Sequence, residues 1–102
     1  MKRVRNASKT IAVTNTLISP SFIGGSSSRV AIVLKNTSTI GEKITIAVGQ
    51  DAIFGQGAIL GQGDTFSLTQ DGSYMPPQDI INAIADVATA TLSIYEEIWE
   101  ED

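Results

Sequence analysis

The sequence of 102 residues contains no cysteine and no histidine. Without cysteine, the chain has no disulfide to cross-link it and no thiolate to act as a nucleophile or zinc ligand. Without histidine, it lacks the commonest general base and the commonest metal ligand. These absences argue against an enzyme and against a bound metal or other cofactor, and they favour a protein that works by binding or assembly.

The sequence also lacks long apolar runs. The N-terminal segment MKRVRNASKT has the positive start of a signal peptide, but the apolar stretch of about 7–15 residues that should follow is missing. No run approaches the roughly 20 apolar residues of a membrane-spanning helix. We therefore expect an unprocessed chain, made in a cytoplasm, with no membrane partner.

The composition indicates one β-rich domain. Hydrophobic residues make up 42% of the chain and charged residues 18%, which suits one globular core rather than a disordered chain. Threonine, serine, isoleucine, alanine and glycine are abundant, whereas strong helix formers are scarce.

Charge is distributed unevenly along the chain. Residues 1–41 carry six basic residues and no acid, a balance of +6, whereas residues 42–102 carry one lysine against eleven acids, a balance of −10, and the two sum to −4. Five of these acids lie in the last seven residues, EEIWEED. Either the two halves interleave within one fold, or the basic end of one subunit meets the acidic end of another, or both ends are solvated tails.

Period-two patterns predict seven or eight short strands. The clearest is RVAIVLKN at residues 29–36, which has apolar residues on both faces and is therefore expected to be central and buried. Residues 42–50 place Ile44, Ile46 and Val48 on one face, and we expect them to form a hairpin with residues 29–36. Further strands are expected at residues 9–14, 58–60 and 64–69. Residues 17–23 are expected at an edge or in a bent connection, because Pro20 interrupts them.

Residues 79–87, DIINAIADV, fit either a helix or a strand. We favour a strand because the segment is short and rich in β-branched residues, and because a strand-like segment follows at residues 89–95. Ala88 is then expected in the turn of a final hairpin.

Residues 55–64, GQGAILGQGD, contain two Gly-Gln-Gly copies. A phosphate-binding loop needs such glycines at the start of a helix, usually beside a lysine. Here an aspartate and a strand-like segment follow instead. The glycines are therefore expected to adopt positive φ at tight corners on either side of a short strand.

Together these patterns predict an all-β fold, a small antiparallel β-sandwich or jelly-roll-like domain of seven to eight strands. We divide the chain into a basic N-terminal arm (residues 1–8), the sandwich (residues 9–95) and an acidic C-terminal tail (residues 96–102).

The succession RVAIVLKNTS, ITIAVGQDA, GAILGQGDTFSL and INAIADVATATLSIYEE, over residues 29–97, resembles small β-sandwich virion proteins of tailed phages and archaeal viruses. These are capsid decoration, spike or fibre-base components. The resemblance implies a non-enzymatic viral structural protein that forms a homo-oligomer and contacts other virion proteins such as a major capsid protein. It also implies a location in the virion after synthesis in a host cytoplasm, and no catalytic or cofactor-binding residues.

Two groups of residues are candidates for partner binding. The first is aromatic and apolar: Tyr95, Ile98 and Trp99, whose tryptophan is the only one in the chain and either anchors an interface or covers an open end of the sandwich. The second is the basic group Lys2, Arg3 and Arg5, for which an acidic protein neighbour is expected rather than nucleic acid.

The remaining polar residues suggest no chemistry. Asp51, Asp64, Asp71 and Asp79 lack the regular alternation of calcium ligands and are expected to cap turns. The alternative to a structural protein is a module that binds glycans or a cell surface, although only Tyr74, in a loop, offers an exposed aromatic platform for a sugar.

Overall fold

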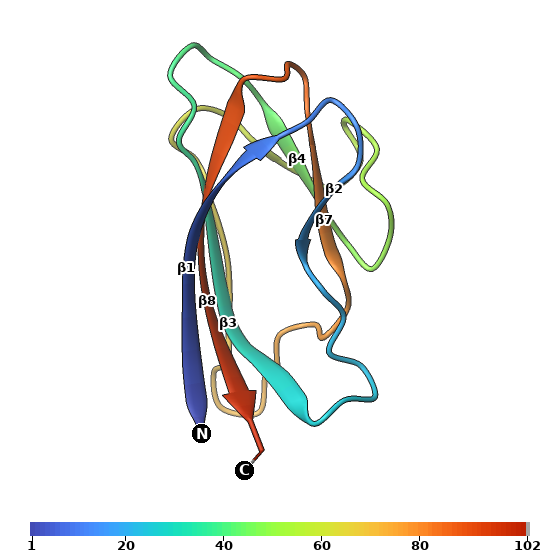
Figure 1. Cartoon of the computed structure of the whole chain (residues 1–102), viewed down its shortest axis with the longest axis vertical. Coiled ribbons are helices and arrows are strands. Elements are labelled where there is room, and N and C mark those ends of the chain that lie inside the picture. Colours follow the sequence, from blue (N-terminus) through green and yellow to red (C-terminus); the bar gives the residue numbers. More distant parts are fainter. Residues whose placement is uncertain (102) are drawn as a thin grey trace.

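The computed structural model describes residues 1–101, which form eight strands and no helix (Figure 1). No helix in this part of the chain is long and apolar enough to cross a membrane. The all-β fold expected from the sequence is confirmed. The strands are β1 (Lys2–Ile11), β2 (Thr16–Ser19), β3 (Ser27–Asn36), β4 (Ile44–Val48), β5 (Ala58–Leu60), β6 (Thr65–Thr69), β7 (Ile81–Ala85) and β8 (Ala90–Glu100).

The strands form two four-stranded antiparallel sheets. Sheet A has the order β1-β8-β3-β6, and sheet B has the order β2-β7-β4-β5. Every connection except β4–β5 passes from one sheet to the other. The two predicted hairpins are therefore wrong: β3 and β4 lie in different sheets, and so do β7 and β8.

The core lies between the sheets and follows the period-two pattern. In sheet A, Ile32 and Leu34 of β3 have no exposed surface, and Ile44 and Ile46 of β4 face them from sheet B with at most 1% exposed. β3 lies between β8 and β6, which confirms its predicted central position.

β7 is a strand, as favoured from its β-branched residues, and it occupies the interior of sheet B between β2 and β4. Ile81, Ala83 and Ala85 point into the core. β2 ends immediately before Pro20 and is an edge strand, also as expected.

The predicted arm and tail are not separate from the sandwich. Residues 2–8 belong to β1, and residues 96–100 belong to β8. Buried residues alternate with more exposed ones along β8, whereas in residues 2–8 of β1 every residue except Arg5 is exposed. The last tail residue, Asp102, lies outside the described residues.

Three of the four glycines in the Gly-Gln-Gly copies adopt positive φ. Gly55, Gly57 and Gly63 have φ of 87°, 137° and 81°, whereas Gly61 does not have positive φ. The first copy turns the chain into β5, and the second turns it into β6. The expectation of tight corners around a short strand is confirmed for these three glycines.

Candidate interaction surface

β1 and β8 pair over ten residues and bring most of the predicted site residues together. The register places Lys2 opposite Trp99, Arg3 opposite Ile98, and Asn6 opposite Tyr95. The basic and acidic ends of the sequence therefore interleave within one chain, as the first of the three alternatives proposed. In Figure 1 these strands run side by side along one layer, with both termini at the same end of the molecule.

Three ion pairs cross this ladder. Lys2 Nζ lies 2.9 Å from Glu97 Oε1, and Arg3 Nε pairs with Glu100 Oε1 at the sheet's end. Hydrogen bonding to Glu97 raises the pKa of Lys2. Both pairs are partly exposed, so solvent screens them and they add little to the stability of the fold. The third pair, Arg5 with Glu96, is more buried than the other two.

The two faces of β8 have different roles. Ile98 points inward and is 2% exposed, so the expectation that it contacts a partner is corrected: it is a core residue. Tyr95 and Trp99 point outward and are 36% and 51% exposed. Trp99 therefore does not cover an open end of the sandwich, because it lies on the outer face of sheet A.

Trp99 forms one wall of a groove of about 430 Å³ on this outer face. We call it the Trp99 groove. Its lining comes from β1, β3, β8 and the loop after β6, and consists of Lys2, Ser28, Val30, Gln70, Met75 and Trp99.

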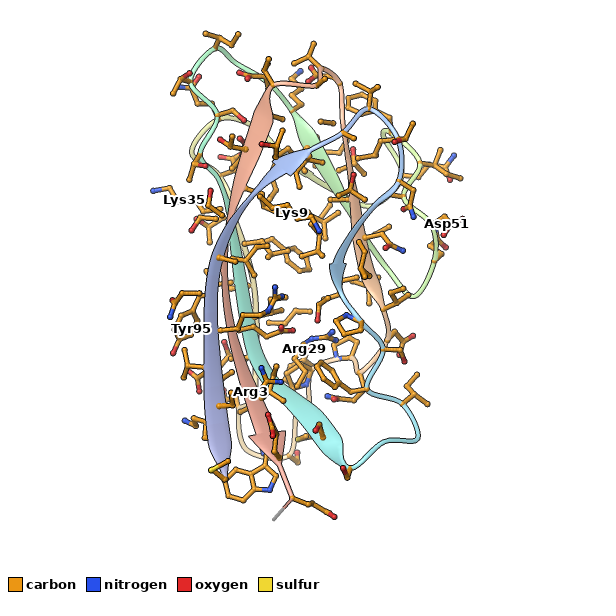
Figure 2. The ribbon with its side chains drawn as sticks, viewed as in Figure 1. Arg3, Lys9, Arg29, Lys35, Asp51 and Tyr95 are labelled. Atoms are coloured by element: carbon orange, nitrogen blue, oxygen red, sulfur yellow. The ribbon has the colours of Figure 1, made fainter. Side chains whose placement is uncertain are left out.

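Arg29 is buried between the sheets, where no exposed surface remains on it (Figure 2). Its Nε donates to Glu96 Oε2 (2.9 Å), and its Nη2 donates to Ser19 Oγ (2.6 Å) and Pro20 O (3.1 Å). Its Nη1 donates to the carbonyl oxygens of two residues before β7, Pro77 at 2.6 Å and Asp79 at 3.0 Å. All five N–H donors of the guanidinium are therefore used.

Glu96, also fully buried, is the acceptor at the centre of this group. Its Oε2 accepts from Ser19 Oγ (2.6 Å) as well as from Arg29, and its Oε1 accepts from Arg5 Nε (3.1 Å) and Nη2 (3.0 Å). We call Arg5, Ser19, Arg29 and Glu96 the Arg29 cluster. It joins β1, β3 and β8 of sheet A to β2 of sheet B. Polar contacts therefore fill this part of the space between the sheets, whereas apolar side chains fill the rest.

Burial acts to raise the pKa of Glu96, but hydrogen bonds from Ser19, Arg29 and Arg5 outweigh it, so the pKa lies below its ordinary value of 4.5. A carboxyl whose pKa is lower in the folded chain than in the unfolded chain stabilises the fold while it is ionised. This stabilisation is complete above pH 4.5 and is lost as the pH falls through the folded-state pKa.

We therefore expect the free energy of unfolding to fall with pH below 4.5, and the Glu96→Gln variant to show a shallower dependence. Urea unfolding of both chains between pH 7 and pH 3 measures this. Glu97, whose pKa is lowered by hydrogen bonds from Tyr95 and Lys2, contributes in the same window, and Glu97→Gln serves as the less buried control. Identical pH dependence in Glu96→Gln and the natural chain would show that Glu96 is not a source of the acid sensitivity.

One side of the sandwich, between edge strands β1 and β2, is closed by cations. Arg5 Nη2 donates to Ile18 O (3.0 Å), and Lys9 Nζ donates to Leu17 O (2.7 Å). These bonds use two backbone carbonyls of β2, and β1 itself carries four basic residues. Charges of this kind block pairing with another strand.

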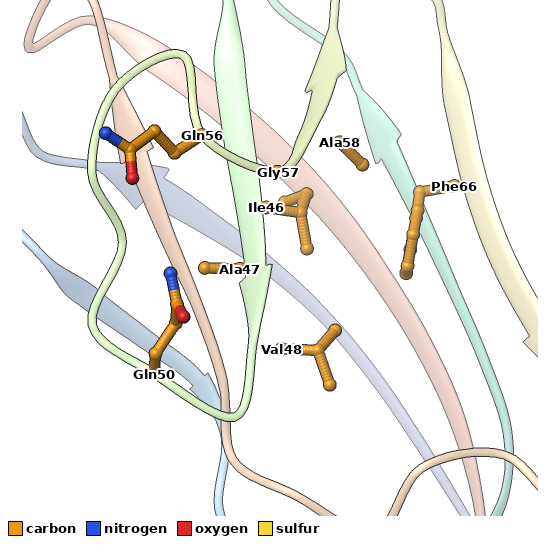
Figure 3. A pocket seen from close by; sticks show the side chains of 8 residues that line it. All are labelled: Ile46, Ala47, Val48, Gln50, Gln56, Gly57, Ala58 and Phe66. Carbon is orange, nitrogen blue, oxygen red and sulfur yellow. The ribbon is translucent and has the colours of Figure 1, made fainter.

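On the opposite side, the edge strands β5 and β6 carry no charged residue, and Asp64 in the turn between them is the nearest acid in sequence. A pocket of about 340 Å³ lies there, lined by residues of β4, β5 and β6 and by Gln50 and Gln56 of the loop between β4 and β5 (Figure 3). We call this the β5–β6 side. β6 has the sequence TFSLT and β5 the sequence AIL, so neither edge carries a charge, a proline or a glycine. The apolar side chains of the pocket are Ile46, Ala47, Val48, Ala58 and Phe66.

The four aspartates considered as calcium ligands stay in separate loops. Within residues 1–101, no three Asp or Glu side chains are grouped so that they could hold a metal ion. Asp64 instead accepts a hydrogen bond from the backbone N–H of Gly61 (2.9 Å), and Asp51 from the side chain of Asn15 (3.5 Å).

This geometry defines an eight-stranded β-sandwich with one open side whose edge strands carry no charged residue. Among solved structures, the chain is similar to a Bacillus endospore appendage protein, described as one of a novel family of disulfide-linked pili. The TM-score is 0.56 at 16% sequence identity, and the match covers 96% of this chain and 83% of the other. No protein-family model and no curated protein matches the sequence. The likeness is one of fold.

Proposed function

We propose that this chain is a non-enzymatic structural subunit that associates with copies of itself through the β5–β6 side. The observation that carries the proposal is the contrast between the two sides of the sandwich. Cations bridge the β1–β2 side, whereas the β5–β6 side presents uncharged strand edges beside an apolar pocket. An unprotected edge is a template for pairing with another strand.

The fold likeness supports a structural role, because the similar protein is described as a subunit of pili. That protein is also described as disulfide-linked, whereas this chain has no cysteine. Copies of this chain therefore need non-covalent contacts, which the pairing of strand edges and the burial of apolar side chains supply.

We propose that this subunit is part of a virion, where a major capsid protein is a further partner. The support is the resemblance of residues 29–97 to virion decoration proteins, together with a fold suited to assembly. A pilus-like fibre of this chain alone is the competing form of the same proposal. Electron microscopy of the purified chain separates them, since open-ended fibres support a pilus-like role and closed rings or small oligomers support attachment to a shell.

Lysine at an exposed position of the β6 edge tests the interface. We expect Ser67→Lys to abolish self-association while changing the melting temperature little, because the side chain points to solvent in the single subunit. Ser8→Lys is the matched control, since Ser8 is an exposed serine on β1, at the opposite edge of the same sheet. The mass in solution, from analytical ultracentrifugation, is the measurement.

Salt gives an independent test of the same interface. The basic and acidic ends are paired within one chain, and strands β5 and β6 carry no charged residue, so the oligomer mass should not change between low and high salt. Dissociation at high salt, or equal loss of mass in Ser67→Lys and Ser8→Lys, contradicts association through the β5–β6 side.

A further inference from the structure

We infer that the Trp99 groove binds an uncharged oligosaccharide, whose sugar rings stack on the indole of Trp99. The groove has the size and the mixed lining of a ligand site, with an apolar surface from Trp99, Met75 and Val30 beside a few polar groups. It lies on the outer face of sheet A, whereas the proposed assembly uses the edges of β5 and β6, so the inference does not depend on the proposed mode of assembly.

The aromatic platform is held in place by the sheet. Trp99 lies opposite Lys2 in the β1–β8 ladder and opposite Ser28 in the β3–β8 ladder, so its backbone is fixed from both sides. Its side chain is nevertheless 51% exposed. A rigid, exposed aromatic ring loses little conformational freedom when a ligand covers it, and this favours binding.

The polar groups of the groove are available to a ligand. Ser28 and Gln70 both line the groove, where the side chain of Gln70 is exposed and that of Ser28 is half-buried. A hydroxyl and a primary amide each donate and accept, which matches the hydroxyl groups of a sugar. A purely apolar ligand would cover these side chains without giving them partners, at a cost in affinity.

The charge of the groove selects against an ionic ligand. Its one charged side chain, Lys2, is paired with Glu97 at 2.9 Å, and Glu97 Oε2 also accepts from the hydroxyl of Tyr95 (2.7 Å). The positive charge is thus neutralised at the groove's edge. A neutral sugar ring, with an apolar face of C–H groups and a rim of hydroxyls, fits both the indole and the polar side chains.

A second aromatic ring extends the surface along β8. Tyr95 points outward on the same face as Trp99 and is 36% exposed. Four residues along a strand separate the two by about 13 Å. A chain of several sugar units, rather than a single sugar, can contact both rings.

The probes are chitohexaose and cellohexaose, two neutral β-1,4-linked oligosaccharides, with a heparin-derived hexasaccharide as the anionic comparison. Because Trp99 is the only tryptophan, fluorescence excited at a wavelength that tyrosine does not absorb reports on this groove alone. We expect a saturable change with at least one neutral probe. No saturable change with either, or stronger binding of the anionic probe, overturns the inference.

Variants measured by calorimetry locate the ligand. We expect Trp99→Ala to weaken binding by about tenfold or more, and Gln70→Ala by about twofold to tenfold. Ser93→Ala, on the outer face of β8 but outside the groove, should bind as the natural chain does. Unchanged affinity in Trp99→Ala overturns the inference.

The mass of the oligomer separates this inference from the proposed function. Trp99→Ala should keep the mass of the natural chain, whereas Ser67→Lys should lose the oligomer and keep sugar binding. A fluorescence change that follows protein concentration without any sugar would show that a second copy covers the groove, and this also overturns the inference.

Discussion

Replacement of Arg29 by methionine is expected to lower the free energy of unfolding by about 3–5 kcal/mol. Methionine has a similar length and no charge, so the side chain can still fill the space. It leaves the carbonyl oxygens of Pro77 and Asp79 without their donors, and it removes one of the two guanidinium partners of the buried Glu96 carboxylate. A small domain has only about 5–15 kcal/mol of total stability, so this change brings the chain close to unfolding.

Arg3→Met is the matched control, because Arg3 also pairs with a glutamate on β8 through Nε but does so near the surface. The side chain of Arg3 is 50% exposed whereas that of Arg29 is 0% exposed. We expect Arg3→Met to cost at most about 1 kcal/mol. Urea unfolding of both variants at pH 7 gives the comparison, and equal costs would show that burial of the Arg29 cluster does not set its importance.

Arg29→Lys tests whether charge alone is sufficient. Lysine keeps the positive charge but has three donors in place of five. It also lacks the planar guanidinium group that donates both to Pro20 O, after β2, and to Pro77 O and Asp79 O, before β7. We expect the Arg29→Lys variant to be destabilised nearly as much as the Arg29→Met variant. Full stability in Arg29→Lys would mean that neutralising Glu96 is the only role of Arg29.

The strands themselves are largely predictable from the sequence, because period-two alternation is a local property. Residues 44–48 are an example in which the pattern gives both the strand and its inward face, and residues 29–36 are one in which it gives the strand. The pairing of strands is not local. β3 is followed in sequence by β4 but pairs with β8 and β6, and short-range patterns carry no information about a crossing from one sheet to the other.

The Arg29 cluster escaped prediction for the same reason. Arg29 begins an apolar strand and was counted only as a positive charge, since its partners lie between 9 and 67 residues away. A bulge between Arg29 and Ala31 adds to the difficulty, because it turns Arg29 inward on the same face as Ile32. A strict alternation would place Val30 there instead.

The paired ends of the chain left a clearer signal. Arg3 and Arg5 are two residues apart near the N-terminus, and acids recur near the C-terminus at Glu96 and Glu100. Alternate spacing of opposite charges suits two antiparallel neighbours that share one face of a sheet. Treating these segments as an arm and a tail overlooked that spacing.

Replacement of Gly57 by alanine is expected to cost about 3 kcal/mol or more. Gly57 has φ of 137°, a conformation that residues with a side chain rarely adopt, and a β-carbon there would overlap the backbone carbonyl oxygen of Ile46. Because that oxygen belongs to β4, neither atom can move without separating β5 from β4. Thermal and urea unfolding measure the loss.

Gly55→Ala is the control that separates the backbone strain of a positive φ from the steric overlap of a new β-carbon. Gly55 also has positive φ, 87°, but a β-carbon added to it meets no atom within 4 Å, so we expect a cost of about 1 kcal/mol. The two glycines belong to the same Gly-Gln-Gly copy, and only Gly57 sets the path into β5. Gly57→Ala should therefore also disturb the β5–β6 side and weaken self-association, whereas Gly55→Ala should leave it intact. Equal stability of the two variants would mean that the close approach to Ile46 does not hold β5 in place.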